Sequence, residues 1–359
     1  MNTRIASLAL MFVAFLFMGQ GCISRSQNES TTLGPAGMFV STDKAETWQP
    51  ISRLVNAEGV LDVSSASVYR IFEDQQDPRA MYWATRGQGL LYTYNNGNSW
   101  QQPEGALSTG FIYSVAVHPK DTCTLYVTNG GFVYKSTDCS RSWVEVYRDD
   151  TGSRIGSLSI NPFAPHQLYL AKSNGDILES QDQGISWKVI YYLGKRVIDL
   201  FSDPYTEGRI YLATETDGIY RSIDGGKQWQ ALDTQLKGFP GGLEYRRFIL
   251  SPQEKDLLYY ISTYGIHISK DGGDNWQTLN LIHPPGSARI FGFAVDPTNP
   301  KEMYYTATIN ERSTLYKTVD GGDSWITKRL PSGQIPTVLR SHPTEIGWLY
   351  LGFTIPVTE

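Results

Sequence analysis

The sequence Ser222-Ile223-Asp224-Gly225-Gly226-Lys227-Gln228-Trp229 carries a pattern that recurs along the chain. The motif Ser/Thr-x-Asp-x-Gly-x-x-Trp returns at 269–276 and 318–325, and looser copies lie at 41–48, 93–100, 136–143 and 180–187. The seven copies end at Trp48, Trp100, Trp143, Trp187, Trp229, Trp276 and Trp325, and neighbours in this series are 42 to 52 residues apart. A period of this size predicts an array of small units, each packed on its neighbours.

A second marker repeats with the first, namely a proline followed seven residues later by a tyrosine. It occurs at Pro119, Pro162, Pro204, Pro252, Pro297 and Pro343, and Gln75 takes the place of the proline in the first unit. Each unit thus predicts a strand before the proline, a second strand with Leu-Tyr, a glycine turn and a third strand. The motif turn follows, and its tryptophan begins a fourth strand. Four short antiparallel strands in about 45 residues are typical of a propeller blade.

The two ends of the chain supply the two halves of one unit. Residues 37–48 match a third strand and the motif, whereas residues 337–353 match a first and a second strand. Six whole units and this shared one predict an all-β, seven-bladed β-propeller of four-stranded antiparallel blades. The ring is closed by a blade shared between the N- and C-termini, which leaves no open strand edge.

The motif residues have structural roles in this interpretation. The Asp side chain accepts backbone N–H groups within the turn, the Gly allows a positive φ, and the Trp buries a large area between blades. Asp43, Asn95, Asp138, Asp182, Asp224, Asp271 and Asp320 fill the acidic position, and Ala45 and Ser140 stand where the motif has Gly. Because the turns lie on separate blades, far apart on the periphery, we predict no metal site and no cofactor.

The first residues are typical of an export signal. Arg4 precedes an apolar run over 5–18, in which Ser7 is the one polar residue, and this run is too short to span a bilayer comfortably. The run leads to Gly19-Gln20-Gly21-Cys22, which resembles a bacterial lipobox apart from Gly19, where that pattern prefers Leu, Val or Ile. We predict a lipoprotein signal peptide over 1–21, a lipidated Cys22 with a flexible tether over 22–36, and the propeller over 37–359. The protein is then expected outside the cytoplasm, lipid-anchored in a bacterial cell envelope, or secreted if Cys22 is not lipidated.

The two remaining cysteines are expected to form a disulfide. Cys123 opens the run 124–129, Gly130-Gly131 is a turn signal, and the run 132–136 leads back. A hairpin folded about the two glycines places Cys123 opposite residues 138 and 139, so we predict a Cys123–Cys139 bond within one blade. Two free thiols are the alternative, which is less expected outside the cytoplasm.

Arginines gather at one register of the strands that precede the prolines, which line the central channel of a propeller. Aligned on the proline, the candidate binding residues stand eight positions before it (Arg154, Arg196, Arg289), six positions before it (Arg246, Tyr113, Tyr69), or adjacent (Arg247). Positions six and eight share one face of a regular strand. We expect these groups around one mouth of the channel, where Arg suits bidentate recognition of carboxylate or phosphate. The alternative is that each arginine pairs with a local acid, for which Asp199, Glu244 and Asp150 are available.

The repeat resembles the Asp-box, or BNR, repeat of sialidases, xyloglucanase-type glycoside hydrolases, the sortilin receptor domain and the photosystem II assembly factor. The resemblance covers about residues 37–354. The blades look closest to those of sortilin and xyloglucanase, whereas seven blades with a lipoprotein signal are similar to the assembly factor. The resemblance implies the fold, but it is compatible with enzymes and receptors alike.

Two functions follow from these observations. The first is a non-catalytic propeller that binds a protein or peptide, an acidic one included, or scaffolds assembly. The alternative is a glycoside hydrolase or carbohydrate-binding propeller. An inverting hydrolase needs two carboxylates about 6.5–9.5 Å apart, and the first strands offer Asp199, Glu73 and Asp74. The segment Tyr69-Arg70-Ile71-Phe72 lacks the proline of the sialidase Phe/Tyr-Arg-Ile-Pro pattern, and a net charge of -5 argues against a nucleic-acid partner.

Overall fold

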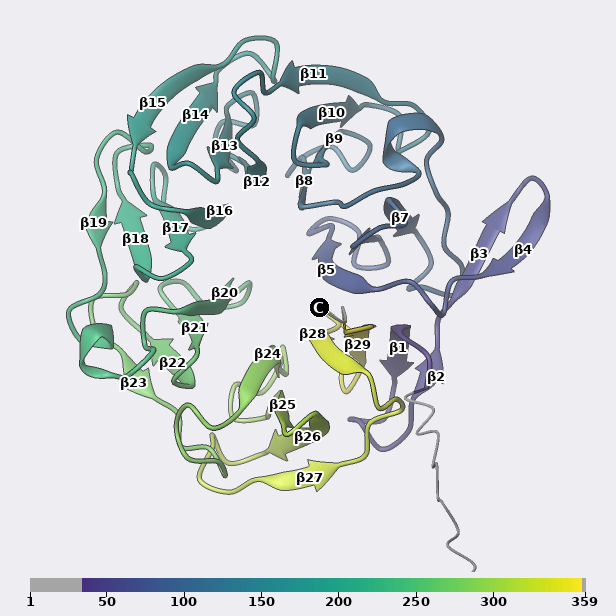
Figure 1. Ribbon diagram of the computed structural model, residues 1–359, viewed down its shortest axis with the longest axis vertical. Helices are drawn as coiled ribbons and strands as arrows, with labels where there is room; N and C mark the ends of the chain where they lie inside the picture. The colour runs from purple at the N-terminus through teal and green to yellow at the C-terminus, as the bar shows by residue number, and fades with distance from the viewer. Residues whose placement is uncertain (1–33, 357–359) are drawn as a thin grey trace, which may run out of the picture. The chain divides into compact units, whose positions relative to one another are not determined.

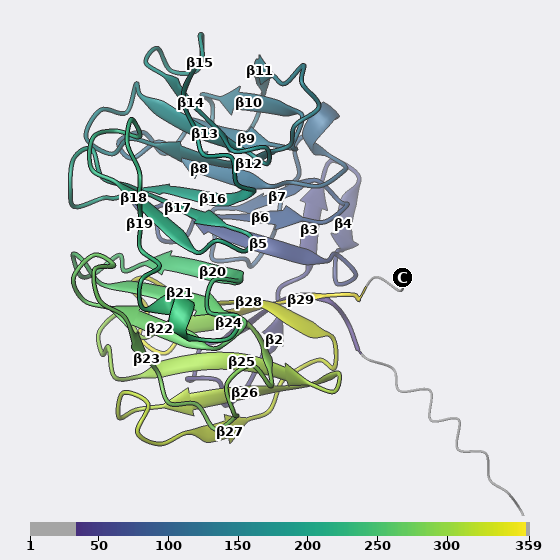
Figure 2. The same cartoon turned by 60° about the vertical axis from the view of Figure 1, so that its left-hand side comes forward.

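The computed structural model describes residues 34–356, so the predicted signal peptide and Cys22 lie outside the described residues. Seven β-sheets are arranged as a ring around a central axis, which Figure 1 shows in face view and Figure 2 after a turn of 60°. This arrangement confirms the predicted all-β, seven-bladed propeller. No described residue belongs to a helix long and apolar enough to cross a membrane.

Five consecutive blades each contain four antiparallel strands in chain order. The first two are β8 (Ser114–Val117), β9 (Leu125–Thr128), β10 (Phe132–Ser136), β11 (Val144–Arg148), and β12 (Ile155–Ile160), β13 (Leu168–Lys172), β14 (Asp176–Ser180), β15 (Lys188–Tyr192). The next is β16 (Val197–Ser202), β17 (Ile210–Thr214), β18 (Ile219–Ser222), β19 (Gln230–Ala231). The last two are β20 (Tyr245–Leu250), β21 (Leu258–Ser262), β22 (Ile266–Ser269), β23 (Gln277–Thr278), and β24 (Arg289–Val295), β25 (Met303–Ile309), β26 (Arg312–Thr318), β27 (Ile326–Lys328). Two 3-10 turns, η1 (Gly105–Leu107) and η2 (Leu236–Gly238), lie in loops.

The closing blade combines both ends of the described chain, as predicted. Its strands are β1 (Gly37–Ser41), β2 (Gln49–Pro50), β28 (Ile335–Ser341) and β29 (Leu349–Thr354), in the order β2-β1-β29-β28. Strands β1 and β29 are antiparallel, with Gly37 opposite Phe353 and Ser41 opposite Leu349. The ring therefore closes through backbone hydrogen bonds inside one sheet.

The blade of β5 (Val68–Glu73), β6 (Met81–Thr85) and β7 (Leu90–Thr93) departs from the regular repeat. Its fourth strand is shortened to one bridge, in which the backbones of Tyr92 and Gln101 exchange hydrogen bonds of 2.9 and 2.8 Å. The cause is a hairpin that the repeat does not contain, β3 (Arg53–Asn56) and β4 (Gly59–Asp62), because the backbone of Trp100 bonds to Arg53 and Val55 of that hairpin. The hairpin projects from the ring in Figure 1 and explains the longest tryptophan separation.

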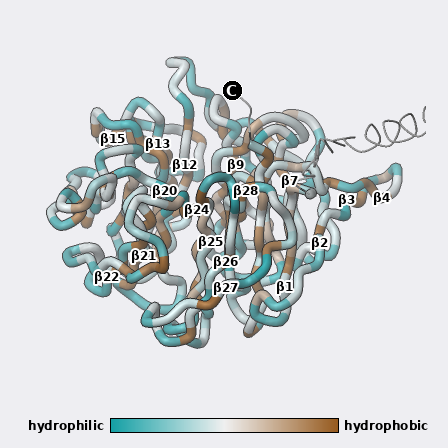
Figure 3. Tube along the Cα trace, turned by 60° about the horizontal axis from the view of Figure 1, so that its bottom comes forward, coloured by the Kyte–Doolittle hydropathy of each residue, from teal (hydrophilic) through white to brown (hydrophobic). Residues whose placement is uncertain are grey.

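The core lies between neighbouring blades and is built by the second strands. The tyrosine of the proline–tyrosine marker is at most 4% exposed in every blade. Its hydroxyl reaches the next blade's motif turn in several cases, as when Tyr126 donates to the Gln183 carbonyl (2.9 Å) and Tyr211 to the Gly272 carbonyl (3.0 Å). The marker tyrosine therefore joins adjacent blades. In Figure 3 the hairpin of β3 and β4 also carries hydrophobic residues, and Val60 and Leu61 on it are more than half exposed.

The motif turns have the predicted hydrogen bonds. In the turn at 136–143, the Asp138 carboxylate accepts the backbone N–H of Ser142 (2.9 Å) and its hydroxyl (2.6 Å), while the Ser136 hydroxyl accepts the N–H of Ser140 (3.0 Å). The same side-chain bonds lower the pKa of Asp43, Asp138 and Asp182 to about 2. Ser140 adopts the glycine conformation with φ 68°, and its hydroxyl is buried without a hydrogen-bond partner.

Cys123 and Cys139 form a disulfide, as predicted from the hairpin. Leu125 lies opposite Ser136 in the β9–β10 pair, and the backbone N–H of Cys139 donates to the carbonyl of Cys123. The bond therefore extends the pairing of two neighbouring strands by a covalent link.

Candidate binding site at the propeller hub

The innermost strands β5, β8, β12, β16, β20, β24 and β28 surround the axis (Figure 1). Bonds between neighbouring blades fix their directions: the Ser157 hydroxyl contacts the backbone of Leu200, and the Ser159 hydroxyl bonds to Ser202. The two contacts advance together along β12 and β16, so the strands are parallel. One end of the hub, which we name the strand-start mouth, thus gathers the beginnings of these strands, and the proline mouth gathers their ends.

All seven predicted binding residues lie at the beginnings of innermost strands. Arg154, Arg196 and Tyr113 directly precede their strands, and Tyr69, Arg246, Arg247 and Arg289 lie within the first three residues of theirs. Arg196 forms an ion pair with Glu215 at 3.0 Å, and not with one of the acids considered from the sequence. Within residues 34–356, no carboxylate lies at ion-pair distance from Arg154, Arg246 or Arg289.

Aromatic rings surround part of this mouth. The rings of Phe111 and Tyr113 are stacked at 4.2 Å, and Tyr69 contacts Phe111 edge-on at 4.7 Å. The guanidinium of Arg154 lies 5.0 Å from the Tyr113 ring, and that of Arg86 lies 5.6 Å from the Tyr69 ring. Guanidinium groups at this distance are attracted to ring faces. The mouth therefore offers flat apolar surfaces beside cationic groups.

A β-bulge alters the register that the sequence alignment assumed. In six of the seven innermost strands the pairing shifts about six positions before the proline, for example between Val68 and Arg70 and between Tyr245 and Arg247. A bulge breaks the alternation of faces. Positions six and eight are therefore not on one regular face, and the residue five positions before the proline points into the hub.

Three charged residues share that fifth position: Arg70, Asp199 and Arg247. Arg70 and Asp199 form an ion pair at 2.7 Å, with side chains only 7% and 3% exposed. The Asp199 carboxylate also accepts the hydroxyls of Tyr245 (2.7 Å) and Ser157 (3.1 Å). Burial opposes the charge on Arg70, but the attraction of Asp199 outweighs it, and the pKa of Arg70 is raised. The sequence alignment missed Arg70 because it used positions six and eight.

The three carboxylates considered for catalysis have different surroundings. Asp199 is fully engaged in the hub pair, and Asp74 accepts the backbone N–H of Gln76 at 2.8 Å within a loop. Glu73 and Asp74 each keep one buried carboxylate oxygen without a hydrogen-bond partner. Burial raises the pKa of Glu73, and the nearby Arg340 acts in the opposite direction. Of the three, Glu73 alone lines the cavity that is described next.

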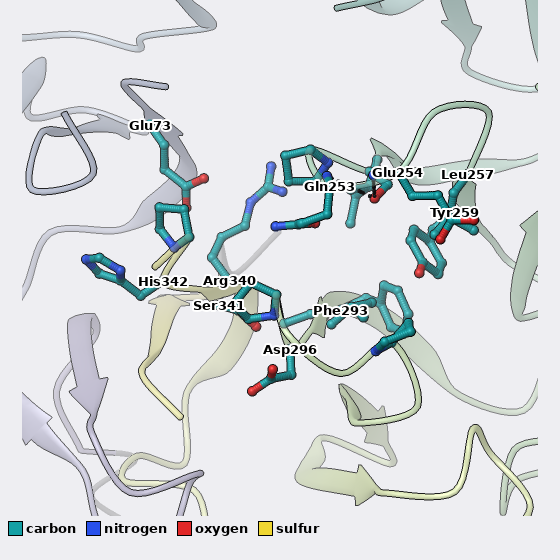
Figure 4. A pocket seen from close by; sticks show the side chains of 18 residues that line it. Glu73, Gln253, Glu254, Leu257, Tyr259, Phe293, Asp296, Arg340, Ser341 and His342 are labelled. Atoms are coloured by element: carbon teal, nitrogen blue, oxygen red, sulfur yellow. Dashed lines mark hydrogen bonds between the residues drawn. The ribbon is translucent and has the colours of Figure 1, made fainter. Parts of the chain in front are cut away.

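That cavity, of about 260 Å³, lies at the proline mouth between the blades of β20, β24 and β28. Leu257, Tyr259 and Phe293 form its apolar wall, while Glu73 lies on one side in Figure 4 and Arg340 extends toward the middle. Glu254 lies on the opposite side in the same view. The cavity is of the kind that holds a small ligand: a mostly apolar wall with a few polar groups.

The fold and the hub define an Asp-box propeller with a charged centre, whose two mouths combine apolar surface with charged groups. Residues 175–280 match the Sortilin-Vps10 family model, described as sortilin, neurotensin receptor 3. The chain is 24% identical over 152 residues to the photosystem II assembly protein Ycf48 of Thermosynechococcus vestitus, covering 42% of this chain and 40% of that protein. It is also 24% identical over 128 residues to a xyloglucanase of Hypocrea jecorina, covering 35% of this chain and 15% of the enzyme.

A solved structure described as YCF48 bound to D1 peptide has the same fold, with a TM-score of 0.59 and 15% identity, covering 82% of this chain and 94% of that chain. The chain is thus a sortilin-, Ycf48- and xyloglucanase-like propeller. It spans less than half the length of the two curated relatives it matches.

Proposed function

We propose that this protein is an exported lipoprotein whose propeller binds a protein or peptide partner, without catalysis, at the strand-start mouth. One observation carries the proposal: Arg154, Arg246 and Arg289 lie at the same end of parallel strands, and no carboxylate of the described chain pairs with them. Like charges at one mouth repel each other, and an acidic partner would offset that repulsion. Guanidinium groups suit carboxylates because they form two parallel hydrogen bonds.

The aromatic rings define the partner further. Tyr69, Phe111 and Tyr113 offer ring surface next to Arg154 and Arg86. Tyr and Arg are the residue types that contribute most to protein interfaces. A segment in which acidic and apolar side chains alternate would match this surface. The relative whose structure holds a D1 peptide supports peptide binding by this fold.

A binding measurement tests this function. The probe is a fluorescein-labelled peptide that alternates Glu with Phe, and its control carries Gln at every Glu. We expect the triple variant R154Q/R246Q/R289Q to bind the acidic probe at least about tenfold more weakly, because hydrogen bonds to charged groups contribute about 1.5–3 kcal/mol each. The matched control R196Q removes an arginine that is already paired with Glu215 and should bind like the wild type. Equal affinity of the triple variant for the acidic probe contradicts the proposal.

A second candidate function is glycoside hydrolysis at the proline mouth. The observation in its favour is that Glu73 and Glu254 line one cavity, and that burial raises the pKa of Glu73, as a general acid requires. Release of reducing sugar from xyloglucan, lost in both E73Q and E254Q, would establish it. A wild type that leaves xyloglucan and other β-glucans intact, while it binds the acidic peptide, favours the first function.

Export and lipidation are a separate part of the proposal. They rest on the apolar run and the lipobox-like segment that ends at Cys22. Labelling of cells with radioactive palmitate should mark the wild type and not C22A. An unlabelled wild type recovered in the medium would show that the protein is secreted without an anchor.

A further inference from the structure

A small cavity of about 70 Å³ lies inside the hub, between the two mouths. Three guanidinium groups line it, those of Arg70, Arg247 and Arg340, together with one carboxylate, Asp199. The rest of the wall is apolar and includes Phe72, Phe201, Phe291 and Phe293. The hub therefore holds three positive charges and one negative charge in an apolar enclosure.

The negative charge is already used. Asp199 lies 2.7 Å from Arg70 and also accepts the hydroxyls of Tyr245 and Ser157. Arg247 has a single hydrogen bond, to the backbone carbonyl of Thr337 at 2.7 Å. The Nε atom of Arg70 is buried without a hydrogen-bond partner. For Arg340, the described chain provides neither an ion pair nor a hydrogen bond.

Among the neighbouring titratable groups, Glu73 lies close enough to Arg340 for the two to interact, but burial raises the pKa of Glu73, so it offsets this excess only in part. Glu73 lines the two larger cavities at the proline mouth but not the hub cavity, and within the described chain it has no ion pair. Burial, followed by repulsion from Arg70 and Arg340, lowers the pKa of Arg247 to about 10. Arg247 therefore remains charged at neutral pH. Buried charges are normally compensated by a partner, because an isolated charge in an apolar environment is strongly unfavourable.

We propose that the hub binds a small monovalent anion, held by Arg247, Arg340 and the free Nε of Arg70. The cavity has room for such an ion. One water molecule requires about 10–15 Å³ of cavity volume, so about 70 Å³ accommodates chloride or the carboxylate of formate. This site is distinct from the strand-start mouth and independent of the function proposed above.

Thermal unfolding in matched salts tests the site. Sodium chloride, sodium formate or sodium gluconate is added at one ionic strength of about 100 mM, which makes general screening equal. Gluconate is disfavoured in the cavity, because the apolar part of the wall offers its five hydroxyl groups no hydrogen-bond partners. We expect the wild-type Tm to be higher in chloride and in formate than in gluconate by about 2 °C or more, because an anion that binds only the folded ring stabilises it.

Two variants make the result specific. R247M and R340M should unfold at the same temperature in all three salts, and R247M should be at least as stable as the wild type in gluconate because it removes an unbalanced charge. R196Q, on the rim, should keep the wild-type response. As a direct readout, a bromide-soaked crystal should show one anomalous peak between Arg247 and Arg340.

A wild-type Tm that is identical in chloride, formate and gluconate overturns the proposal. So does an equal salt response in R247M, R340M and the wild type, since it would place the effect elsewhere. A bromide position away from the hub, with none between Arg247 and Arg340, has the same consequence. Failure of the acidic-peptide measurement would leave this inference untouched, because Arg154, Arg246 and Arg289 do not line the hub cavity, and R196Q is a control in both experiments.

Discussion

Replacing Asp199 by Asn should strongly destabilise the ring. The Arg70–Asp199 pair is 2.7 Å apart and its side chains are 7% and 3% exposed, so the neutral amide would leave the guanidinium of Arg70 buried without its counter-charge. Removing one partner of a buried ion pair typically costs about 3–5 kcal/mol. Because the side chains that surround the pair come from different blades, including β5, β12, β16 and β20, we expect the loss near the upper part of this range.

The double variant R70M/D199L provides the contrast. Apolar side chains of similar volume often replace a buried ion pair with no loss of stability or with a gain of about 1–4 kcal/mol. R70M alone should cost less than D199N, since Asp199 would keep the hydroxyls of Tyr245 and Ser157 as donors. With D199L as the other single variant, these proteins and the wild type form a double-mutant cycle in which the coupling energy should be large and favourable.

The assay is equilibrium unfolding in urea at a fixed chloride concentration, followed by tryptophan fluorescence and by circular dichroism. The midpoint should fall in D199N with an unchanged slope, which identifies a change of stability and not of the unfolded state. A folded D199N that loses less than about 1 kcal/mol would refute the reasoning. Such a value is typical of exposed pairs and would mean that water reaches the hub.

Three further outcomes are expected. The free energy of unfolding of S140G in urea should be about 1 kcal/mol higher than that of the wild type. Glycine removes the strain of a left-handed backbone, about 1–2 kcal/mol, and an unpaired buried hydroxyl, whereas the added chain entropy costs about 0.5–1 kcal/mol. The matched change G226S should be destabilising. The pKa of Asp43, Asp138 and Asp182 is about 2 in the folded ring and about 3.9 in an unfolded chain. The stabilisation that these carboxylates provide is therefore complete above about pH 5 and is lost as the pH falls from about 4 to 2. Calorimetry should show the Tm falling in that window, less steeply in D138N, and a Tm that does not change with pH would contradict the assignment. Replacing Cys123 and Cys139 by Ser should cost about 2–3 kcal/mol for a closed loop of this length, and an intact mass of the wild type without reductant should show the loss of two hydrogens.

The blade count could be predicted because its determinants are local. The Trp229 motif and the proline–tyrosine marker each fix a turn or a strand within a few residues, and their spacing counts the blades. The disulfide was equally accessible, since Gly130-Gly131 sets the register that brings Cys139 to Cys123. These features depend on short-range geometry, which the sequence states directly.

The hub could not be predicted in the same way. The partnership of Arg70 with Asp199 joins strands that are separated by several blades, so no local pattern names the partner. The bulges shift the side chains by one position, and the alignment on prolines treated the strands as regular. One sequence signal could have revealed the hub. Otherwise apolar strands carry a charged residue five positions before the proline, at Arg70, Asp199 and Arg247.

The hairpin of β3 and β4 was also missed, although the longest gap between tryptophans marks its place. An insertion in a repeat shows itself as extra length, but that length does not specify a structure. The backbone pairing of Trp100 with the hairpin depends on the position of the neighbouring blade, which the repeat pattern does not contain.

The pairing of β1 with β29 has a consequence for how the molecule is made. Strand β1 pairs with β2 soon after it is made, but its other edge stays unpaired until residues 349–353 are present. During synthesis, the first strands therefore lack the partner that covers their edge, and an unpaired edge attracts other chains. We therefore expect such a chain to bind a chaperone that shields extended segments until its last residues have been synthesised.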